Sequence, residues 1–358
     1  MKKQCCLVIF LLIITNTLFA QELLWKVGVR SFFDNSEFGH SNVQIPQSMS
    51  GVHVAPEIGV GWAKKHRVLV GVDLLHEYGS NKAIDFHDII AYYEYAGSPF
   101  HFYMGAIPRD LVLSKYPRMF FQDSVRYYRP TINGLFWELS RNGNYANVWL
   151  DWTSRQTTER DENFFMGWSG RYNLGILYAQ HFGYMFHFAG KMNPLPDEDH
   201  PLHDNGLLLT SLGVDLAHKT SFEKLDLNIG WSIGMEKSRG NDISHKPQGL
   251  LSELNVEYRG LGLFNTYYKG EGQQLFYPQY NNKLYWGDPF YRTDEYNRLD
   301  LYVNFIKTEV VEIKLTFSFH MTENTTYNQQ ALYATFNLDN FRSNKNDRKY
   351  KYLWDNWF

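Results

Sequence analysis

The sequence has almost no cysteine. Its only two, Cys5 and Cys6, stand in the first 20 of 358 residues, where two lysines, an apolar run over 7–14 and a small residue at Ala20 follow one another. That order predicts a secretion signal removed after Ala20, because the apolar run is short for an anchor helix of ~20 residues. The exported chain would then have no cysteine, which excludes disulfides, thiolate nucleophiles and cysteine metal sites.

The sequence also lacks long hydrophobic runs and an excess of positive charge. Beyond residue 20, no apolar run reaches the ~18 residues of a membrane-spanning helix. The formal net charge is −3, so a nucleic-acid partner is not indicated. No ligand pattern indicates a metal or another cofactor, and we predict none. Aromatic residues are plentiful at 17%, which suits a barrel with aromatic girdles at both membrane interfaces.

The clearest pattern is the strict alternation over Glu223–Glu236. From residue 225 on, its odd positions are all apolar: Leu225, Leu227, Ile229, Trp231, Ile233 and Met235. A strand turns successive side chains to opposite faces, so this segment has one apolar and one polar side. It exceeds the ~5–6 residues of a usual soluble strand and fits the ~9–11 residues of a tilted strand that crosses a bilayer. Val311–Phe319 repeats the pattern.

Similar segments recur along the chain and are separated by short turns and long loops in alternation. We predict strands at 23–33, 51–62, 67–78, 86–95, 100–107, 131–139, 145–154, two within 163–190, then 206–216, 223–236, 249–259, 261–268, 297–306, 310–321 and 329–340. The turn within 163–190 lies near Arg171 or near Gln180–Gly183. With both termini on the side of the short turns, the number of strands must be even.

This organisation resembles Gram-negative outer-membrane porins over roughly Glu22–Asn340. We expect an all-β, antiparallel, up-and-down transmembrane barrel of about 16 strands (14–18), with short periplasmic turns and long extracellular loops. The chain then divides into a signal peptide (1–20), a barrel (21–341) and a tail (342–358) of uncertain structure, because Phe341–Phe358 does not alternate. A secreted soluble β-sandwich is the competing architecture, since its strands would alternate as well.

The polar face of the strands predicts a channel lining. Its charged members are Lys26, Arg30, Glu57, Asp73, Glu77, Asp151, Asp226, Glu253, Glu257, Arg259, Arg298, Asp300, Glu312 and Lys314. Barrels of this size leave a water-filled lumen, where rings of charge select solutes. The alternative is that these charges only pair with one another inside a polar lumen.

Two long loops are candidate parts of the channel. Pro108–Pro130 is basic, and in porins a long loop folds inward, so Arg109, Lys115, Arg118, Arg126 and Arg129 are candidates for a constriction that favours anions or sugar hydroxyls. A solvated outer loop that contacts lipopolysaccharide phosphates is the alternative. Lys269–Glu295 is rich in rings, and Tyr277, Tyr280, Tyr285, Trp286 and Tyr291 are candidates to stack on a ligand, or else to pack on one another.

No catalytic constellation is evident. His203-Asp204-Asn205-Gly206 resembles the motif of outer-membrane phospholipases, but Asn205 stands where a serine is required, so we predict no enzymatic activity. The acidic cluster at 197–204 is a solvated loop or, less simply, a calcium site.

The resemblance to porins implies passive diffusion of small hydrophilic solutes through an integral outer-membrane channel. Its partners would be outer-membrane lipid, lipopolysaccharide and those solutes, and a homotrimer is possible. The alternatives are a barrel for surface binding or envelope assembly and a lipid-modifying barrel enzyme.

Overall fold

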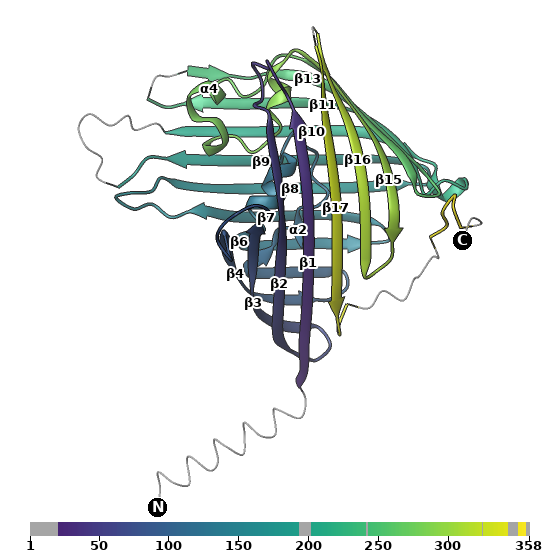
Figure 1. Ribbon diagram of the computed structural model, residues 1–358. Coiled ribbons are helices and arrows are strands. Elements are labelled where there is room, and N and C mark those ends of the chain that lie inside the picture. Colours follow the sequence, from purple (N-terminus) through teal and green to yellow (C-terminus); the bar gives the residue numbers. More distant parts are fainter. Residues whose placement is uncertain (1–20, 193–201, 241–242, 324, 343–349, 356–358) are drawn as a thin grey trace, which may run out of the picture.

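A computed structural model describes residues 21–192, 202–240, 243–323, 325–342 and 350–355, so the predicted signal peptide lies outside the described part. Sixteen long strands follow one another in chain order, each antiparallel to its neighbours, and the last pairs with the first (Figure 1). The sheet therefore closes into a barrel, and the predicted fold is confirmed. None of the described helices is long and apolar enough to cross a membrane.

The strands cover most of the chain. Their bounds are β1 Gln21–Glu37, β2 Gln47–Trp62, β3 His66–Glu77, β4 Phe86–Ala96, β5 Phe100–Pro108, β6 Thr131–Arg141, β7 Asn144–Ser154, β8 Glu162–Leu174, β9 Leu177–Ala189, β10 His203–Asp215, β11 Lys224–Ser238, β13 Gln248–Tyr258, β14 Leu261–Gly270, β15 Glu295–Lys307, β16 Val311–Thr322 and β17 Thr326–Asp339. A short strand, β12 Ile243–His245, pairs with the end of β11. The helical turns are α2 Arg109–Val112, α3 Asp123–Tyr128, α4 Tyr277–Tyr280, η1 Ala217–Lys219, η2 Asn281–Lys283 and η3 Pro289–Arg292.

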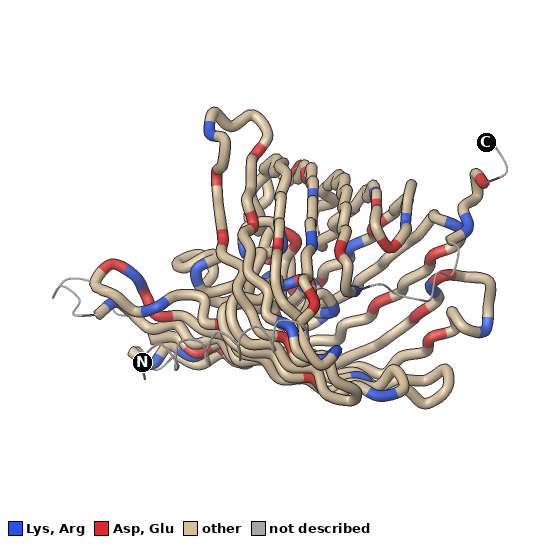
Figure 2. The backbone as a smooth tube through the Cα atoms, turned by 90° about the horizontal axis from the view of Figure 1, so that it is seen from below, with Lys and Arg blue, Asp and Glu red and all other residues tan. Residues whose placement is uncertain are grey.

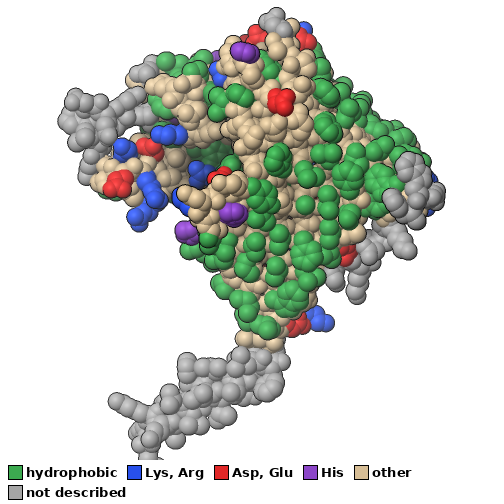
Figure 3. All heavy atoms as spheres, in the orientation of Figure 1, with side chains coloured by type: hydrophobic (Ala, Val, Ile, Leu, Met, Phe, Trp, Pro, Cys, Tyr) green, Lys and Arg blue, Asp and Glu red, His purple; other side chains and the backbone are tan. Residues whose placement is uncertain are grey.

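Alternation places apolar side chains outside the barrel and polar ones inside. In β11, Ile229 and Trp231 are 51% and 50% exposed, whereas Asn228 and Ser232 are 4% and 0% exposed. Hydrophobic side chains cover the wall formed by β1, β2, β16 and β17, and charged ones lie mainly at its edges (Figure 3). The apolar face therefore meets lipid.

The outward face of β11 provides a stability test. Replacing Ile229 by arginine should destabilise the folded barrel by about 2–4 kcal/mol, the cost of a charge on the lipid-facing side near the bilayer centre. Ile243 of β12, 41% exposed in an extracellular loop, is the matched control, and Ile243→Arg should change stability by less than about 0.5 kcal/mol. Unfolding in urea, followed in lipid vesicles, measures both; equal effects would contradict the lipid-facing assignment.

The turn that alternation alone left open lies between β8 and β9, beyond Arg171 and before Gln180. Gly175 occupies it with φ of 66°, a conformation that glycine adopts without strain. Short turns of this kind connect the strands at one end of the barrel, where β1 begins and β17 ends. That end is periplasmic by the usual asymmetry of outer-membrane barrels.

The described tail residues do not add a strand. The Arg342 guanidinium lies 3.4 Å from the Glu94 carboxylate of β4. The Tyr350 hydroxyl donates to Glu257 of β13 at 2.5 Å, and the Leu353 N–H donates to the Arg259 carbonyl at 3.1 Å. The tail therefore lies against the periplasmic end of the barrel.

Candidate functional site

The loop between β5 and β6 folds into the barrel. Its helix α2 lies within the ring of strands (Figure 1). The Arg109 guanidinium contacts Asp151 of β7 at 2.6 Å, and Arg118 contacts Asp300 of β15 at 3.0 Å, so the loop is tied to opposite walls. Burial alone would raise the pKa of the Asp123 carboxyl in this loop, but the neighbouring Arg118 and Arg298 hold that pKa below its ordinary value. The basic loop is thus largely neutralised.

The loop between β14 and β15 enters the barrel as well. The Gln122 N–H donates to the Trp286 carbonyl at 2.7 Å, and the Asp288 N–H donates to the Arg118 carbonyl at 2.9 Å. A Cβ on Gly287 would lie 2.1 Å from the Met119 carbonyl oxygen, so the two loops approach as closely as a glycine permits. We refer to these loops, residues 109–130 and 271–294, as the plug.

Aromatic packing attaches the plug to the inner wall. Tyr285, Trp286 and Tyr291 are 3%, 6% and 2% exposed. The ring centroid of Trp286 lies 4.9 Å from that of Phe165 of β8. These three rings do not fit the expected ligand-stacking role, because packing against the wall removes them from solvent; Tyr277 and Tyr280 are only partly buried.

Most of the predicted lining charges lie inside the barrel and are paired. Lys26 contacts Glu57 at 2.6 Å. Arg30 contacts Asp73 at 2.6 Å and Asp110 of the plug at 3.1 Å. Acidic and basic positions are interspersed along the strands and loops (Figure 2), which is the arrangement that such pairing requires.

The remaining predicted charges have varied surroundings. Arg298 contacts Asp300 at 2.7 Å, and Glu257 pairs with Lys224 at 2.9 Å and Lys307 at 3.0 Å. Three other carboxylates accept hydrogen bonds: Glu77 from Tyr128, Asp226 from Tyr178 and Glu253 from Asn228. Three cations lie over aromatic rings: Lys314 over Tyr302, Lys115 over Tyr145 and Arg129 over Trp286. Arg126 contacts Asp110, and Glu312 is exposed on β16. Arg259 is not on the inner face of a strand, because it forms the turn after β13 with φ of 49°. Whether this lining selects solutes stays a prediction.

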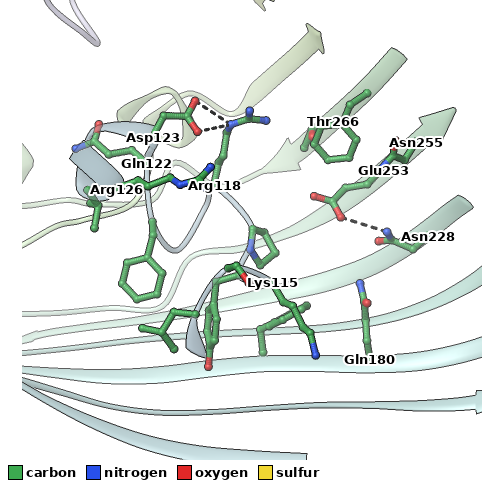
Figure 4. Close-up of a pocket in the computed structure, with 18 of the residues that line it drawn as sticks. Lys115, Arg118, Gln122, Asp123, Arg126, Gln180, Asn228, Glu253, Asn255 and Thr266 are labelled. Carbon is green, nitrogen blue, oxygen red and sulfur yellow. Dashed lines mark hydrogen bonds and ion pairs between the residues drawn. The ribbon is translucent and has the colours of Figure 1, made fainter. Parts of the chain in front are cut away.

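The periplasmic half of the barrel contains a cavity of about 470 Å³. It lies between the plug, which contributes Lys115 and Arg118, and the wall of β9, β11, β13 and β14, which contributes Gln180, Asn228 and Glu253 (Figure 4). Sequence reasoning missed Gln180 and Asn228, because it followed only charged residues.

A second group of polar side chains lies on the outside of the barrel. Ser31 of β1 is opposite Val52 of β2, and Val52 is opposite His76 of β3. These three residues point outward, because their chain neighbours Phe32, His53 and Leu75 are buried inside at 3%, 2% and 1% exposure. Ser31, His76, Tyr78 and Asp85 form what we call the outer-rim cluster.

Hydrogen bonds organise the outer-rim cluster. The Ser31 and Tyr78 hydroxyls are 2.8 Å apart. His76 Nδ1 lies 3.0 Å from the Lys82 carbonyl oxygen and 3.7 Å from Asp85 Oδ2. A carbonyl accepts only from a protonated nitrogen, so Nδ1 carries the proton and Nε2 keeps its lone pair.

The Asp85 carboxylate is fixed in turn. The Ser80 hydroxyl and the Glu77 N–H donate to it, and these bonds hold the pKa of Asp85 below its ordinary value. The carboxylate is therefore ionised at neutral pH, and it lies 3.7 Å from His76 Nδ1.

The position of the outer-rim cluster relative to the bilayer follows from the strand register. Directly toward the periplasm lies an outward apolar row of Val29, Val54 and Leu74, which pair across β1, β2 and β3. Toward the extracellular side, the Ser48 hydroxyl donates to Asn35 at 2.7 Å. The next outward residue of β1 on that side, Phe33, is still apolar and 50% exposed. The cluster therefore lies just below the level at which the wall changes from apolar to polar and lipid headgroups begin.

The residues singled out as an incomplete phospholipase motif lie elsewhere. His203 is buried at 2% exposure, and its ring centroid is 4.6 Å from that of Tyr280 in the plug. The acidic cluster at 197–204 falls mostly outside the described residues. Among the residues that are described, no group of three or more His, Cys, Asp or Glu side chains is arranged to hold a metal ion.

Comparison with known proteins gives a family match and a fold match. A family model described as lipid A 3'-O-deacylase-type matches residues 15–345. A loop-deletion mutant of OmpT, an outer-membrane protein of Vibrio cholerae, is 9% identical with a TM-score of 0.55, over 89% of this chain and 100% of that one. Salmonella typhi OmpF is 10% identical with a TM-score of 0.50, over 89% and 97%. No curated protein matches the sequence.

These matches decide two of the sequence-based expectations. The protein is an integral outer-membrane β-barrel, as predicted. The expectation that it is not an enzyme is wrong, because the family model that matches most of the chain describes an enzymatic family.

Proposed function

Because this chain belongs to the lipid A 3'-O-deacylase-type family, we propose that it is an outer-membrane ester hydrolase that removes an acyl chain from lipid A. The reaction takes place at the outer-rim cluster. The observation that carries this assignment is the placement of Ser31, Tyr78, His76 and Asp85 on the lipid-facing surface at the boundary between apolar and polar rows.

The location suits a lipid substrate. Lipid A lies in the outer leaflet, with its acyl esters at the depth where headgroups meet hydrocarbon. An ester held at Ser31 lies beside the outward apolar residues Val54, which is exposed, and Val29, which is half-buried, so its acyl chain can remain in the bilayer during the reaction. No part of the substrate needs to pass the plug.

The chemistry follows from the hydrogen bonds. Ser31 Oγ attacks the ester carbonyl carbon, His76 Nε2 accepts the serine proton, and that proton goes to the departing sugar oxygen. Water, deprotonated by the same imidazole, then releases the fatty acid and restores Ser31. The Tyr78 hydroxyl, bonded to Ser31, is the nearest donor to the oxyanion. Ser31 and His76 lie on β1 and β3 with Val52 of β2 between them, a separation of two strand spacings or ~10 Å. The proton transfer therefore requires a bridging water or an approach of the two side chains when the substrate is bound.

Mass spectrometry of lipid A tests the proposal. Purified, folded protein incubated with lipid A in detergent micelles should convert lipid A to a species that is lighter by one acyl chain. The reaction should also release one equivalent of fatty acid. Phosphatidylethanolamine under the same conditions is the control substrate. Heat-modifiable gel mobility shows whether the protein is folded. If lipid A stays intact after incubation with protein that passes this test, the proposal is overturned.

A second candidate function is limited passage of small hydrophilic solutes through the lumen. It is supported by the charged cavity of about 470 Å³ and by the porin-like fold. The plug occupies the extracellular side of that cavity, so passage depends on separating the two loops from each other or from the wall. Single-channel recording in planar bilayers tests this function. If neither the folded protein nor the Gly287→Val variant conducts current, this function is excluded.

Replacing Gly287 by valine should loosen the plug. The new side chain cannot occupy the 2.1 Å gap to the Met119 carbonyl, so the two backbone bonds between the loops break. Losing them costs about 1–3 kcal/mol and raises the population of separated loops roughly tenfold or more. We expect more frequent channel openings in planar bilayers.

Gly39 is the matched control, because a Cβ there meets nothing within 4 Å. Gly39→Val should leave the conductance unchanged. Equal conductance of the two variants would show that the loops do not depend on this close approach.

A further inference from the structure

The outward wall is hollowed at the periplasmic end of β6–β9. A groove of about 620 Å³ lies there, and its lining is almost entirely apolar. Pro99, Leu139 and Tyr172 contribute to its sides, and Ala146 and Ala179 to its floor. Because the wall faces lipid, the groove opens into the bilayer and not into solvent.

Strand register explains why the wall is hollow at this point. Leu139, Ala146, Gly170 and His181 are direct neighbours on β6, β7, β8 and β9. A Cβ on Gly170 would lie 3.1 Å from the Tyr145 carbonyl oxygen, so the floor accepts no larger residue there without movement. Large outward residues such as Val148 and Tyr172, 45% and 63% exposed, surround this strip of small ones.

One end of the groove has a satisfied polar group. His181 Nε2 accepts a hydrogen bond from Trp168 Nε1 at 3.0 Å, so the proton of the neutral imidazole is on Nδ1. Nδ1 therefore donates to Thr210 Oγ1, 2.8 Å away. Thr210 is exposed and keeps its own hydroxyl proton. It is therefore a hydrogen-bond donor at the edge of an otherwise apolar surface.

The opposite edge of the groove has a positive charge. Arg141 lines the groove, is exposed, and ends β6 at the periplasmic turn. It stands two residues from Leu139, so the side of the groove formed by Leu139 lies ~7 Å from it along the strand. That spacing matches a lipid whose phosphate is at the membrane surface and whose ester oxygens lie slightly deeper.

We propose that this groove binds one glycerophospholipid of the inner leaflet. An acyl chain lies over Ala146, Gly170 and Ala179, and the phosphate pairs with Arg141. Thr210 is four strands from Arg141 and bounds the apolar surface at its far edge. Charge complementarity selects this occupant over a second copy of the barrel, because a partner barrel would meet Arg141 with a turn and not with a phosphate. This site is separate from the outer-rim cluster, on other strands and at the other membrane surface.

Native mass spectrometry of the full-length, detergent-solubilised protein tests the proposal, with dioleoylphosphatidylglycerol as the added probe. We expect one retained lipid per barrel in the unmodified protein and loss of that lipid in Ala146→Leu, because leucine fills the space of the acyl chain. Val148→Leu, on the same strand and face but outside the groove, should retain the lipid. Heat-modifiable gel mobility establishes that each variant is folded.

The charge at the edge has its own variants. Arg141→Gln should weaken retention of phosphatidylglycerol about fivefold, the effect of one arginine near an anionic membrane surface. Lys219→Gln, at another periplasmic turn, should leave it unchanged. Equal retention in Ala146→Leu and Val148→Leu would overturn the proposal. So would a spectrum in which Ala146→Leu converts an oligomer to a monomer, since the groove would then be an interface between copies.

Discussion

Replacing Arg298 by methionine is expected to destabilise the barrel by about 3–5 kcal/mol, the cost of removing one partner from a buried group of charges. Arg298 is 5% exposed and contacts Asp300 at 2.7 Å, Asp123 at 3.3 Å and Asp288 at 3.7 Å. Two of these carboxylates belong to the plug. Without the guanidinium, Arg118, which contacts Asp123 and Asp300 at 3.0 Å, is left as the cation beside these three acidic groups.

Urea unfolding in detergent micelles, followed by tryptophan fluorescence, measures this effect. Arg239→Met is the control, because Arg239 pairs with Asp204 but its side chain is 54% exposed, and an exposed pair contributes only about 0–1 kcal/mol. Arg298→Met together with Asp300→Asn should recover part of the loss. Equal stability of the two single variants would mean that the plug is not held by this group of charges.

Replacing His76 by alanine should lower the rate of fatty-acid release from lipid A by about 10²–10⁴-fold, the usual contribution of a positioned general base. Ser31→Ala should have an effect of the same order, because the two residues act on one proton. The initial rate of release, measured by mass spectrometry, gives both values. Neither residue packs in the interior, so the folded barrel should persist.

His87 and Ser252 provide the controls for these variants. His87 is exposed on the neighbouring strand β4, and Ser252 belongs to the outward set of β13 beside Leu251, which is 0% exposed. Their alanine variants should release fatty acid at rates within about twofold of the unmodified protein, because Ser252 is on a distant strand and His87, although it is opposite Leu74, takes no part in the proton transfer. Active His76→Ala would place the ester hydrolysis elsewhere on the chain.

The barrel itself could be predicted from the sequence because alternation is a local property. Leu225 to Met235 shows which face of β11 meets lipid, and the long-short rhythm of the connections shows how the strands follow one another. The turn at Gly175 could not be placed, because the residues around it alternate through both candidate positions.

The outer-rim cluster could not be found this way. Ser31 lies far from His76 and Asp85 in the sequence, and only the register between strands brings it to the same face. Register depends on turn geometry and on bulges, neither of which alternation shows. The sequence-based prediction of functional residues rested on inward-facing charges, so it did not include polar residues on the lipid-facing side.

The plug was only partly foreseen. The basic composition of Pro108–Pro130 suggested an inward loop, and the rings of Lys269–Glu295 suggested either stacking or packing. The two loops contact each other at Gly287 through backbone hydrogen bonds. The sequences of these loops have no repeating pattern from which such bonds could be predicted. A porin-like fold also does not imply a porin's function, which is why the resemblance led to the wrong expectation about enzymatic activity.

If the outer-rim cluster is the catalytic site, the chemistry occurs on the outer wall and not through the lumen. Fatty-acid release from vesicles that contain lipid A, measured in parallel for the unmodified protein, Gly287→Val and His76→Ala, tests it most directly. We predict equal release by the first two and at least a hundredfold less by His76→Ala. No release by the unmodified protein, or release that changes with Gly287→Val and not with His76→Ala, would contradict the claim.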